Sequence, residues 1–197
     1  MSLRVTFVAT ARSSPLLAER FQDDRPLDQA GWDEMQRVAH DLLPLAAADL
    51  RYCSPTPRSR ATGDALGYAP LSQLALRDCD MGRWRGFTLG EAMAREPEAV
   101  DAWLANPRAT PHGGESLLAF ISRVGGWLDT RPVGDGGRIV AVAEPSVIRA
   151  ALVYALKAPP PTYWNIDVRP LSTTTVTGLA GRWNLRLDGA PAHASRT

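Results

Sequence analysis

The chain of 197 residues has only three histidines and two cysteines, and this scarcity excludes several kinds of site. The two cysteines, Cys53 and Cys79, give no disulfide framework, so a reducing cytoplasmic compartment is expected. The histidines and cysteines show no spacing typical of a metal site. The sequence therefore predicts neither a bound metal nor a cofactor.

The sequence also lacks a strong charge of either sign and a long apolar run. The formal net charge is +1, which provides no basic face for nucleic acid. No stretch approaches the ~20 apolar residues of a membrane span, and the first residues lack the apolar core of a signal peptide. We therefore expect no nucleic-acid or membrane partner, and these features leave the oligomeric state open.

Apolar patterns that alternate between strand and helix spacing indicate an α/β fold. Residues 3–8 and 138–143 are apolar-rich runs, as expected for strands buried on both faces. Residues 27–43 carry apolar side chains at helical spacing, with Asp28 as the expected N-cap and Pro44 as the expected end. The remaining predicted elements are a strand at 50–53, helices at 57–66, from 88 onward, at 117–128 and at 147–156, and a hairpin at 172–179 and 183–187.

This order of elements predicts one domain over residues 1–188. The expected architecture is a three-layer α/β sandwich with a mainly parallel sheet and helices on both faces. Residues 189–197 are small and polar, and they are predicted to form a flexible tail. The irregular stretches 77–87 and 105–115 are predicted to lie above the sheet as functional loops.

Several motifs follow one another in a fixed order along the chain. They are LDQAG at 27–31, SPTPRSRAT at 54–62, LRDCDMGRWRG at 76–86 and PHGGES at 111–116. The strand ends VTFVATARS at 5–13 and IVAVAEPSVIRAAL at 139–152 flank this set. Together the motifs resemble the histidine phosphatase superfamily, the phosphoglycerate mutase-like proteins. The resemblance covers most of the chain and implies the α/β fold of that family.

Both strand ends depart from the family pattern where it carries the chemistry. In the family, the first strand runs into Arg-His-Gly and a late strand into Ser-His-Gly. One histidine becomes phosphohistidine, and the other histidine and two arginines hold the phosphoryl oxygens. The resemblance places Ala9 at the first arginine, Thr10 at the nucleophile and Glu144 at the second histidine. Arg58 matches the remaining arginine, and Asp78 matches the acidic proton donor.

These replacements predict that the phosphohistidine mechanism is absent. A threonine hydroxyl without a base is a poor nucleophile at neutral pH. Loss of an arginine at Ala9 removes a bidentate phosphate contact. A Glu144 carboxylate ~4 Å from a phosphate charge would repel it by ~4 kcal/mol at an effective dielectric near 20.

The pocket expected from the resemblance still contains polar residues. If the protein is an enzyme, Asp78 and Glu144 are the candidate catalytic residues, because two carboxylates in different environments can divide into acid and base. The candidate ligand-binding residues are Thr10, Arg12, Arg58 and His112. A small polar or carboxylated ligand is expected, with Arg58 as its anchor. In the opposing interpretation, Asp78, Glu144 and Arg58 form an ion-pair network that replaces the lost phosphate.

Three classes of function follow from these residues. The first is a histidine phosphatase-like protein without catalysis that binds a small polar ligand in the former phosphate pocket. The second is a repurposed acid–base enzyme that uses Asp78 and Glu144. The third is a residual phosphatase or phosphoglycerate mutase-like activity with an unrecognised nucleophile. Neither a ligand identity nor a partner follows from the sequence.

Overall fold

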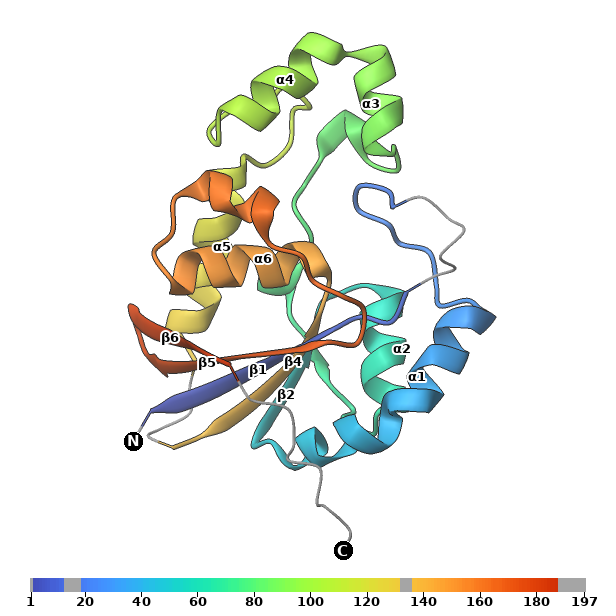
Figure 1. Cartoon of the computed structure of the whole chain (residues 1–197), viewed down its shortest axis with the longest axis vertical. Coiled ribbons are helices and arrows are strands. Elements are labelled where there is room, and N and C mark those ends of the chain that lie inside the picture. The colour runs from blue at the N-terminus through green and yellow to red at the C-terminus, as the bar shows by residue number, and fades with distance from the viewer. Residues whose placement is uncertain (1, 13–18, 132–135, 188–197) are drawn as a thin grey trace, which may run out of the picture.

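A single six-stranded sheet forms the centre of the molecule (Figure 1). The computed structural model describes residues 2–12, 19–131 and 136–187, and the predicted tail at 189–197 lies outside these ranges. The sheet has the order β3-β2-β4-β1-β5-β6. Its strands are β1 (Leu3–Ala9), β2 (Leu50–Cys53), β3 (Leu71–Ser72), β4 (Arg138–Ala143), β5 (Thr173–Leu179) and β6 (Arg182–Arg186).

The pairing of the strands confirms a mainly parallel sheet with an antiparallel hairpin at one side. Strands β1 and β4 are parallel neighbours, and β2 is parallel to both β4 and β3. Strand β5 runs antiparallel to β1, and β6 runs antiparallel to β5. In the register of β1 and β4, Ala9 lies opposite Ala143. Thr10 and Glu144 therefore leave the sheet side by side at the carboxyl edge, where open α/β sheets place their ligand sites.

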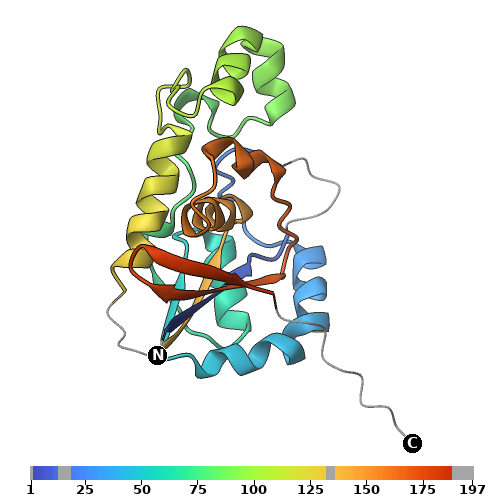
Figure 2. The same cartoon turned by 60° about the vertical axis from the view of Figure 1, so that its left-hand side comes forward.

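Helices cover both faces of the sheet, and this arrangement confirms the predicted three-layer sandwich (Figures 1 and 2). Helices α5 (Leu117–Asp129) and α6 (Pro145–Ala155) pack on one face, and α1 (Gln29–Leu42) and α2 (Pro57–Ala65) lie on the other. Successive side chains of a strand point to opposite faces. Phe7 accordingly joins the core under α5 and α6, whereas Val8 joins the core under α1 and α2.

Local capping interactions fix where the helices begin. Asp28 accepts a hydrogen bond from the Gly31 backbone N–H and caps α1, as its sequence position predicts. Thr88 and Glu91 form both hydrogen bonds of a capping box at the start of α3 (Leu89–Arg95). Ser116 caps α5 through the backbone N–H of Ala119. Because these contacts join residues close together in the chain, the starts of these helices could be predicted from the sequence.

Helices α3 and α4 (Pro97–Ala105) stand beyond the carboxyl edge of the sheet, at the top of both views (Figures 1 and 2). The sequence analysis did not predict α4. A signal for it exists, because Pro97 suits a first helical turn and the buried Val100 and Trp103 lie three residues apart. Trp103 packs edge-to-face against Trp84, with 5.8 Å between the ring centroids, so an aromatic cluster fixes this helical pair to the body.

Two proline-containing segments form 3₁₀ helices. Helix α1 ends at Leu42, ahead of Pro44 as predicted, and the chain continues as the 3₁₀ helix η1 (Leu43–Ala47), because Pro44 is compatible with a first helical turn. The prolines at 159–161 lead into the 3₁₀ helix η4 (Pro160–Asn165). Within the described ranges, none of the helices has both the length and the apolar character that crossing a bilayer requires.

Candidate functional site

A cavity of about 420 Å³ opens at the carboxyl edge of the sheet, where β1 and β4 end. Its wall contains most of the predicted site residues, namely Thr10, Arg12, Arg58, Asp78 and Glu144. These residues come from four different segments of the chain, and the fold brings them together. The volume falls in the ~300–1,000 Å³ range of small-molecule sites.

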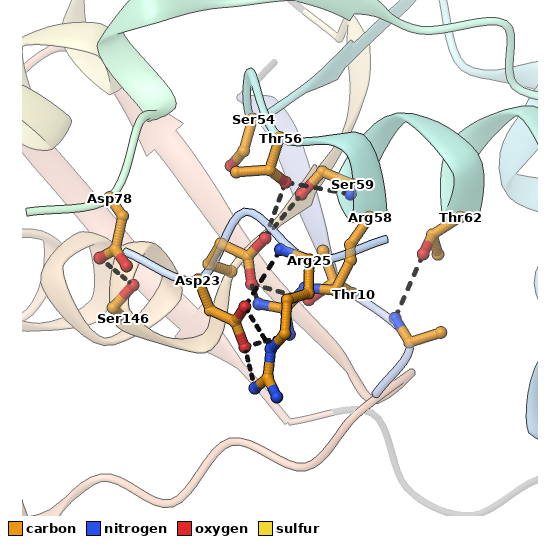
Figure 3. Close-up of polar contacts among 12 residues, drawn as sticks. Thr10, Asp23, Arg25, Ser54, Thr56, Arg58, Ser59, Thr62, Asp78 and Ser146 are labelled. Carbon is orange, nitrogen blue, oxygen red and sulfur yellow. Dashed lines mark hydrogen bonds and ion pairs between the residues drawn. The ribbon is translucent and has the colours of Figure 1, made fainter. Parts of the chain in front are cut away.

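The carboxylate of Glu144 is surrounded by donors that occupy both of its oxygens. Figure 3 shows the donor residues Thr10, Thr56, Arg58 and Ser59 close together. Arg58 donates to Oε2 from Nη2 at 2.9 Å, and the Thr10 hydroxyl donates to the same oxygen at 3.1 Å. Thr56 and Ser59 donate their hydroxyls to Oε1 at 2.8 and 3.3 Å. Glu144 is only 4% exposed. One arginine and three hydroxyls thus hold a negative group at the point where the resemblance places a phosphoryl group.

The ion pair of Arg58 and Glu144 extends into a row of alternating charges. Nη1 of Arg58 lies 3.4 Å from Oδ2 of Asp23, and Arg25 contacts the same carboxylate through Nη2 at 2.5 Å. Burial opposes the ionisation of Asp23, but the hydrogen bonds from Arg25 and the charge of Arg58 lower its pKa overall. The row contains two arginines and two carboxylates, so it brings no net positive charge to the former phosphate position.

The Thr10 hydroxyl is engaged by Glu144 in this arrangement. The residue is 3% exposed, and its Oγ1 donates to Glu144. Its backbone N–H donates to the carbonyl of Ala143, which holds the first residue after β1 against the end of β4. The next residue is fixed as well, because the Ala11 N–H donates to Oγ1 of Thr62. The segment after β1 is therefore anchored as a structural element.

Asp78 lies in the cavity wall apart from the Glu144 network, as Figure 3 shows. Its Oδ1 accepts hydrogen bonds from the hydroxyl of Ser146 and the backbone N–H of Cys79, both at 2.7 Å. Burial raises the pKa of Asp78 to about 6. The hydrogen bond from Ser146 lowers this pKa, and the negative charge of Glu144 raises it. The prediction of two carboxylates in different environments at one cleft matches this geometry.

The remaining predicted ligand residues occupy different positions. Arg12 lines the cavity and is exposed. Among the described residues, His112 is not part of the cavity wall. It is buried, and its ring packs against that of Trp84 with 5.2 Å between the centroids. Its Nδ1 accepts the N–H of Gly114 at 3.0 Å, and burial lowers its pKa. In the described structure His112 thus holds the Gly-Gly turn through the Gly114 N–H. A role of His112 in ligand binding remains a prediction.

Several residues of the site were not identified from the sequence. Asp23 and Arg25 precede α1 in a segment without periodicity, so no local pattern predicts that Asp23 lies between Arg25 and Arg58. Thr56 and Ser59 lie inside the SPTPRSRAT motif, and their hydroxyls were a signal that the motif contributes more than Arg58. No group of three or more His, Cys, Asp or Glu residues within the described ranges could hold a metal ion.

Comparisons with known proteins extend the resemblance beyond the motifs. The sequence profile of the histidine phosphatase superfamily (branch 1) matches residues 18–189 of this chain. A glucosyl-3-phosphoglycerate phosphatase of Mycolicibacterium vanbaalenii is 32% identical over 183 residues, which cover 86% of this chain and 79% of that protein. A bifunctional protein of Mycobacterium tuberculosis is 30% identical over 137 residues, which cover 67% of this chain. The match spans only 38% of the length of that second relative.

A solved structure of a mycobacterial glucosyl-3-phosphoglycerate phosphatase in complex with VO3 shares the fold. Its TM-score is 0.77 at 23% identity, and the superposition covers 93% of this chain and 97% of that one. The matched range of the superfamily profile begins after β1 and Thr10. This profile match therefore does not include the end of β1.

Proposed function

The chain belongs to the histidine phosphatase superfamily, and we propose that it is a member without phosphohistidine chemistry that binds a small polar ligand beside the former phosphate position. The observation that carries this proposal is the environment of Glu144. Its carboxylate accepts hydrogen bonds from Arg58, Thr10, Thr56 and Ser59. Such a set of donors suits the oxygens of an anion. The side chain of Glu144 thus takes the position that a phosphoryl group would need.

The same geometry argues against a residual phosphatase that uses Thr10. The contact of the Thr10 hydroxyl with Glu144 at 3.1 Å has the form of a nucleophile and its base. However, this carboxylate is already held in an ion pair with Arg58 at 2.9 Å. A phosphate ester that approached Thr10 would also meet the negative charge of Glu144. We therefore do not propose for this chain the phosphatase activity that the names of its relatives state, because that activity requires a nucleophile.

Phosphatase assays on matched variants test this proposal. The wild-type protein, Thr10→Val and Glu144→Gln are incubated with para-nitrophenyl phosphate, phosphoserine and 3-phosphoglycerate, and released phosphate is measured. We expect rates equal to the buffer blank for all three proteins, and no acid-labile phosphate on the protein. Hydrolysis by the wild type that disappears in Thr10→Val, or phosphate trapped on His112, would contradict the proposal. A surface variant, Arg60→Gln, controls for a contaminating phosphatase.

A second candidate function is acid–base catalysis by Asp78. It is favoured because Asp78 has a pKa of about 6 and lines the cavity. Its Oδ1 accepts two hydrogen bonds, and within the described ranges no hydrogen bond to its Oδ2 is found, so this oxygen can carry or receive a proton. A group with this pKa suits proton transfer near neutral pH.

Exchange of carbon-bound protons tests this second function without knowledge of the natural substrate. A panel of 2-oxo and 2-hydroxy acids is incubated with the protein in D₂O and followed by proton NMR. Acid–base catalysis predicts loss of a carbon-bound proton signal with the wild type and a loss at least about 100-fold slower with Asp78→Asn. Equal rates for the two proteins, or no exchange with any member of the panel, would contradict this candidate.

A further inference from the structure

The cavity continues from the Glu144 network into an apolar chamber below α3 and α4. Trp103 and Trp164 meet there with 4.7 Å between ring centroids, and Tyr163 packs edge-to-face against Trp164 at 4.9 Å. The other apolar members of this wall are Phe21, Met81, Leu89, Leu104, Leu117 and Phe120. Trp164 and Leu104 are each 37% exposed, and Leu89 is 46% exposed. This wall fits the apolar body of a ligand that covers these side chains.

Arg149 places a positive charge at the same cavity without a carboxylate partner. Within the described ranges, no carboxylate oxygen lies within 4.0 Å of its guanidinium, and its buried Nε has no hydrogen-bond partner. Arg58, by contrast, has both terminal nitrogens on carboxylates. Arg149 lies 5.9 Å above the ring centroid of Tyr163. Burial raises the pKa of Tyr163 far above neutrality, so its hydroxyl stays protonated as a donor.

The charges around Arg149 limit how much negative charge a ligand can carry. Five arginines and four carboxylates line the cavity, namely Arg12, Arg20, Arg25, Arg58 and Arg149 with Glu19, Asp23, Asp78 and Glu144. Their formal sum is +1, which one negative charge balances. A phosphate dianion would exceed this balance and would face Asp78 and Glu144 in the same cavity.

We infer that the cavity binds an amphipathic ligand with a single carboxylate, whose head lies on Arg149 and Tyr163 and whose apolar body lies against Trp103, Trp164 and Phe120. This inference rests on the proposed function, because it requires that Glu144 and not a phosphate occupies the former phosphate position. It replaces Arg58 as the expected anchor of the ligand, since Arg58 is held by Asp23 and Glu144.

A comparison of an acid with its neutral amide tests the inference on the unmodified protein. The probes are 3-phenylpropionate and 3-phenylpropionamide, which share the apolar body and differ in the charge of the head. Binding is followed by the fluorescence of the cavity tryptophans and by titration calorimetry. We expect the acid to bind at least about tenfold more tightly than the amide, as for a charged hydrogen bond. Equal binding of both probes, or binding of neither, overturns the inference.

Variants then assign the head and the body of the ligand separately. Arg149→Gln should remove the preference for the acid, whereas Arg149→Lys should keep part of it. Trp164→Ala should weaken both probes by the same factor, because it removes apolar wall and no charge. Arg60→Gln makes the same change of charge on an exposed residue outside the cavity wall and should have no effect. A preference for the acid that survives Arg149→Gln places the head elsewhere and overturns the assignment.

Inorganic phosphate separates this inference from the proposed function. Phosphate that competes with 3-phenylpropionate would show that the cavity still accepts a phosphoryl group, and this result contradicts the inference. Phosphatase turnover that depends on Thr10 would contradict the proposed function instead. An amphipathic carboxylate that binds through Arg149, together with blank-level hydrolysis of phosphate esters, supports both.

Discussion

Removal of the Glu144 side chain should convert the former phosphate position into an anion-binding site. In Glu144→Ala, the hydroxyls of Thr10, Thr56 and Ser59 and one nitrogen of Arg58 lose their acceptor. Arg58 then keeps only the longer contact with Asp23, at 3.4 Å. A vacated set of one cation and three hydroxyl donors is what a small oxyanion requires. The variant should therefore be unstable in the absence of such an ion and stabilised by it.

The expected loss of stability follows from the burial of the pair. Glu144 has 5% of its side-chain surface exposed, and Arg58 has 14%. Breaking a buried ion pair by removing one partner costs ~3–5 kcal/mol, since the other charge stays buried without compensation. For a chain of this length, ~1 kcal/mol lowers the melting temperature by ~2–4 °C. We therefore expect Glu144→Ala to melt roughly 6–20 °C below the wild type.

The assay is thermal unfolding at increasing concentrations of acetate and inorganic phosphate. An ion that binds only the folded state stabilises it by ~2.7 kcal/mol at 100 times its dissociation constant. Either ion should thus restore much of the loss in Glu144→Ala. The wild type should show only the general stabilisation that phosphate gives to folded proteins. The measured quantity is the rise in melting temperature that each ion causes in Glu144→Ala, compared with the rise that it causes in the wild type.

Asp129→Ala provides the matched control for this rescue. Asp129 accepts hydrogen bonds from the hydroxyl of Tyr154 at 2.6 Å, the indole of Trp183 at 2.8 Å and the N–H of Gly181 at 2.9 Å. These donors are neutral, so the variant should lose stability without gaining affinity for an anion. The reasoning is refuted if Glu144→Ala is as stable as the wild type, or if phosphate rescues it no more than Asp129→Ala.

Two further predictions concern stability. Because burial raises the pKa of Asp78 to about 6 in the folded state, its neutral form stabilises the fold at low pH. This contribution to stability is lost as the pH rises from ~4 through about 6. In urea unfolding, Asp78→Asn should therefore be on the order of 1–3 kcal/mol more stable than the wild type at pH 8, and equally stable at pH 4. A variant that is less stable than the wild type at pH 8 would refute the claim that burial raises the pKa of Asp78. Gly31→Ala should cost ~1–3 kcal/mol, since its Cβ would lie 2.2 Å from the carbonyl oxygen of Arg12, whereas Gly126→Ala meets open space on α5 and should gain up to ~1 kcal/mol. Equal unfolding midpoints for the two glycine variants would contradict this packing.

Much of the fold could be predicted because its signals are local. The apolar runs of β1 and β4 and the caps Asp28, Thr88 and Ser116 depend on residues near one another in the chain. Helix α4 has a local signal in Pro97 and in the spacing of Val100 and Trp103, but the tryptophan cluster that holds it exists only in the folded chain. Pro44 follows the end of α1 as predicted, and the 3₁₀ helix there was not predicted, because a proline stops an α-helix but also fits the start of a 3₁₀ helix.

The sequence by itself carries the proposal that the phosphohistidine chemistry is missing. The resemblance to the family places Thr10 at the nucleophile and Glu144 at the second histidine, and residue identity alone decides that neither position holds a histidine. The order of the motifs also determined that the two strand ends meet, because parallel strands present their carboxyl ends at one edge.

Only the tertiary structure decided which side chains Glu144 contacts at the end of the sheet. Glu144 contacts Arg58 across 86 positions of sequence and Thr10 across 134. Distances of about 3 Å between such side chains depend on strand register and on the placement of α2 against β4, which no local pattern encodes. The same long-range packing buries His112 outside the cavity wall and leaves Arg149 in that wall without a described carboxylate partner.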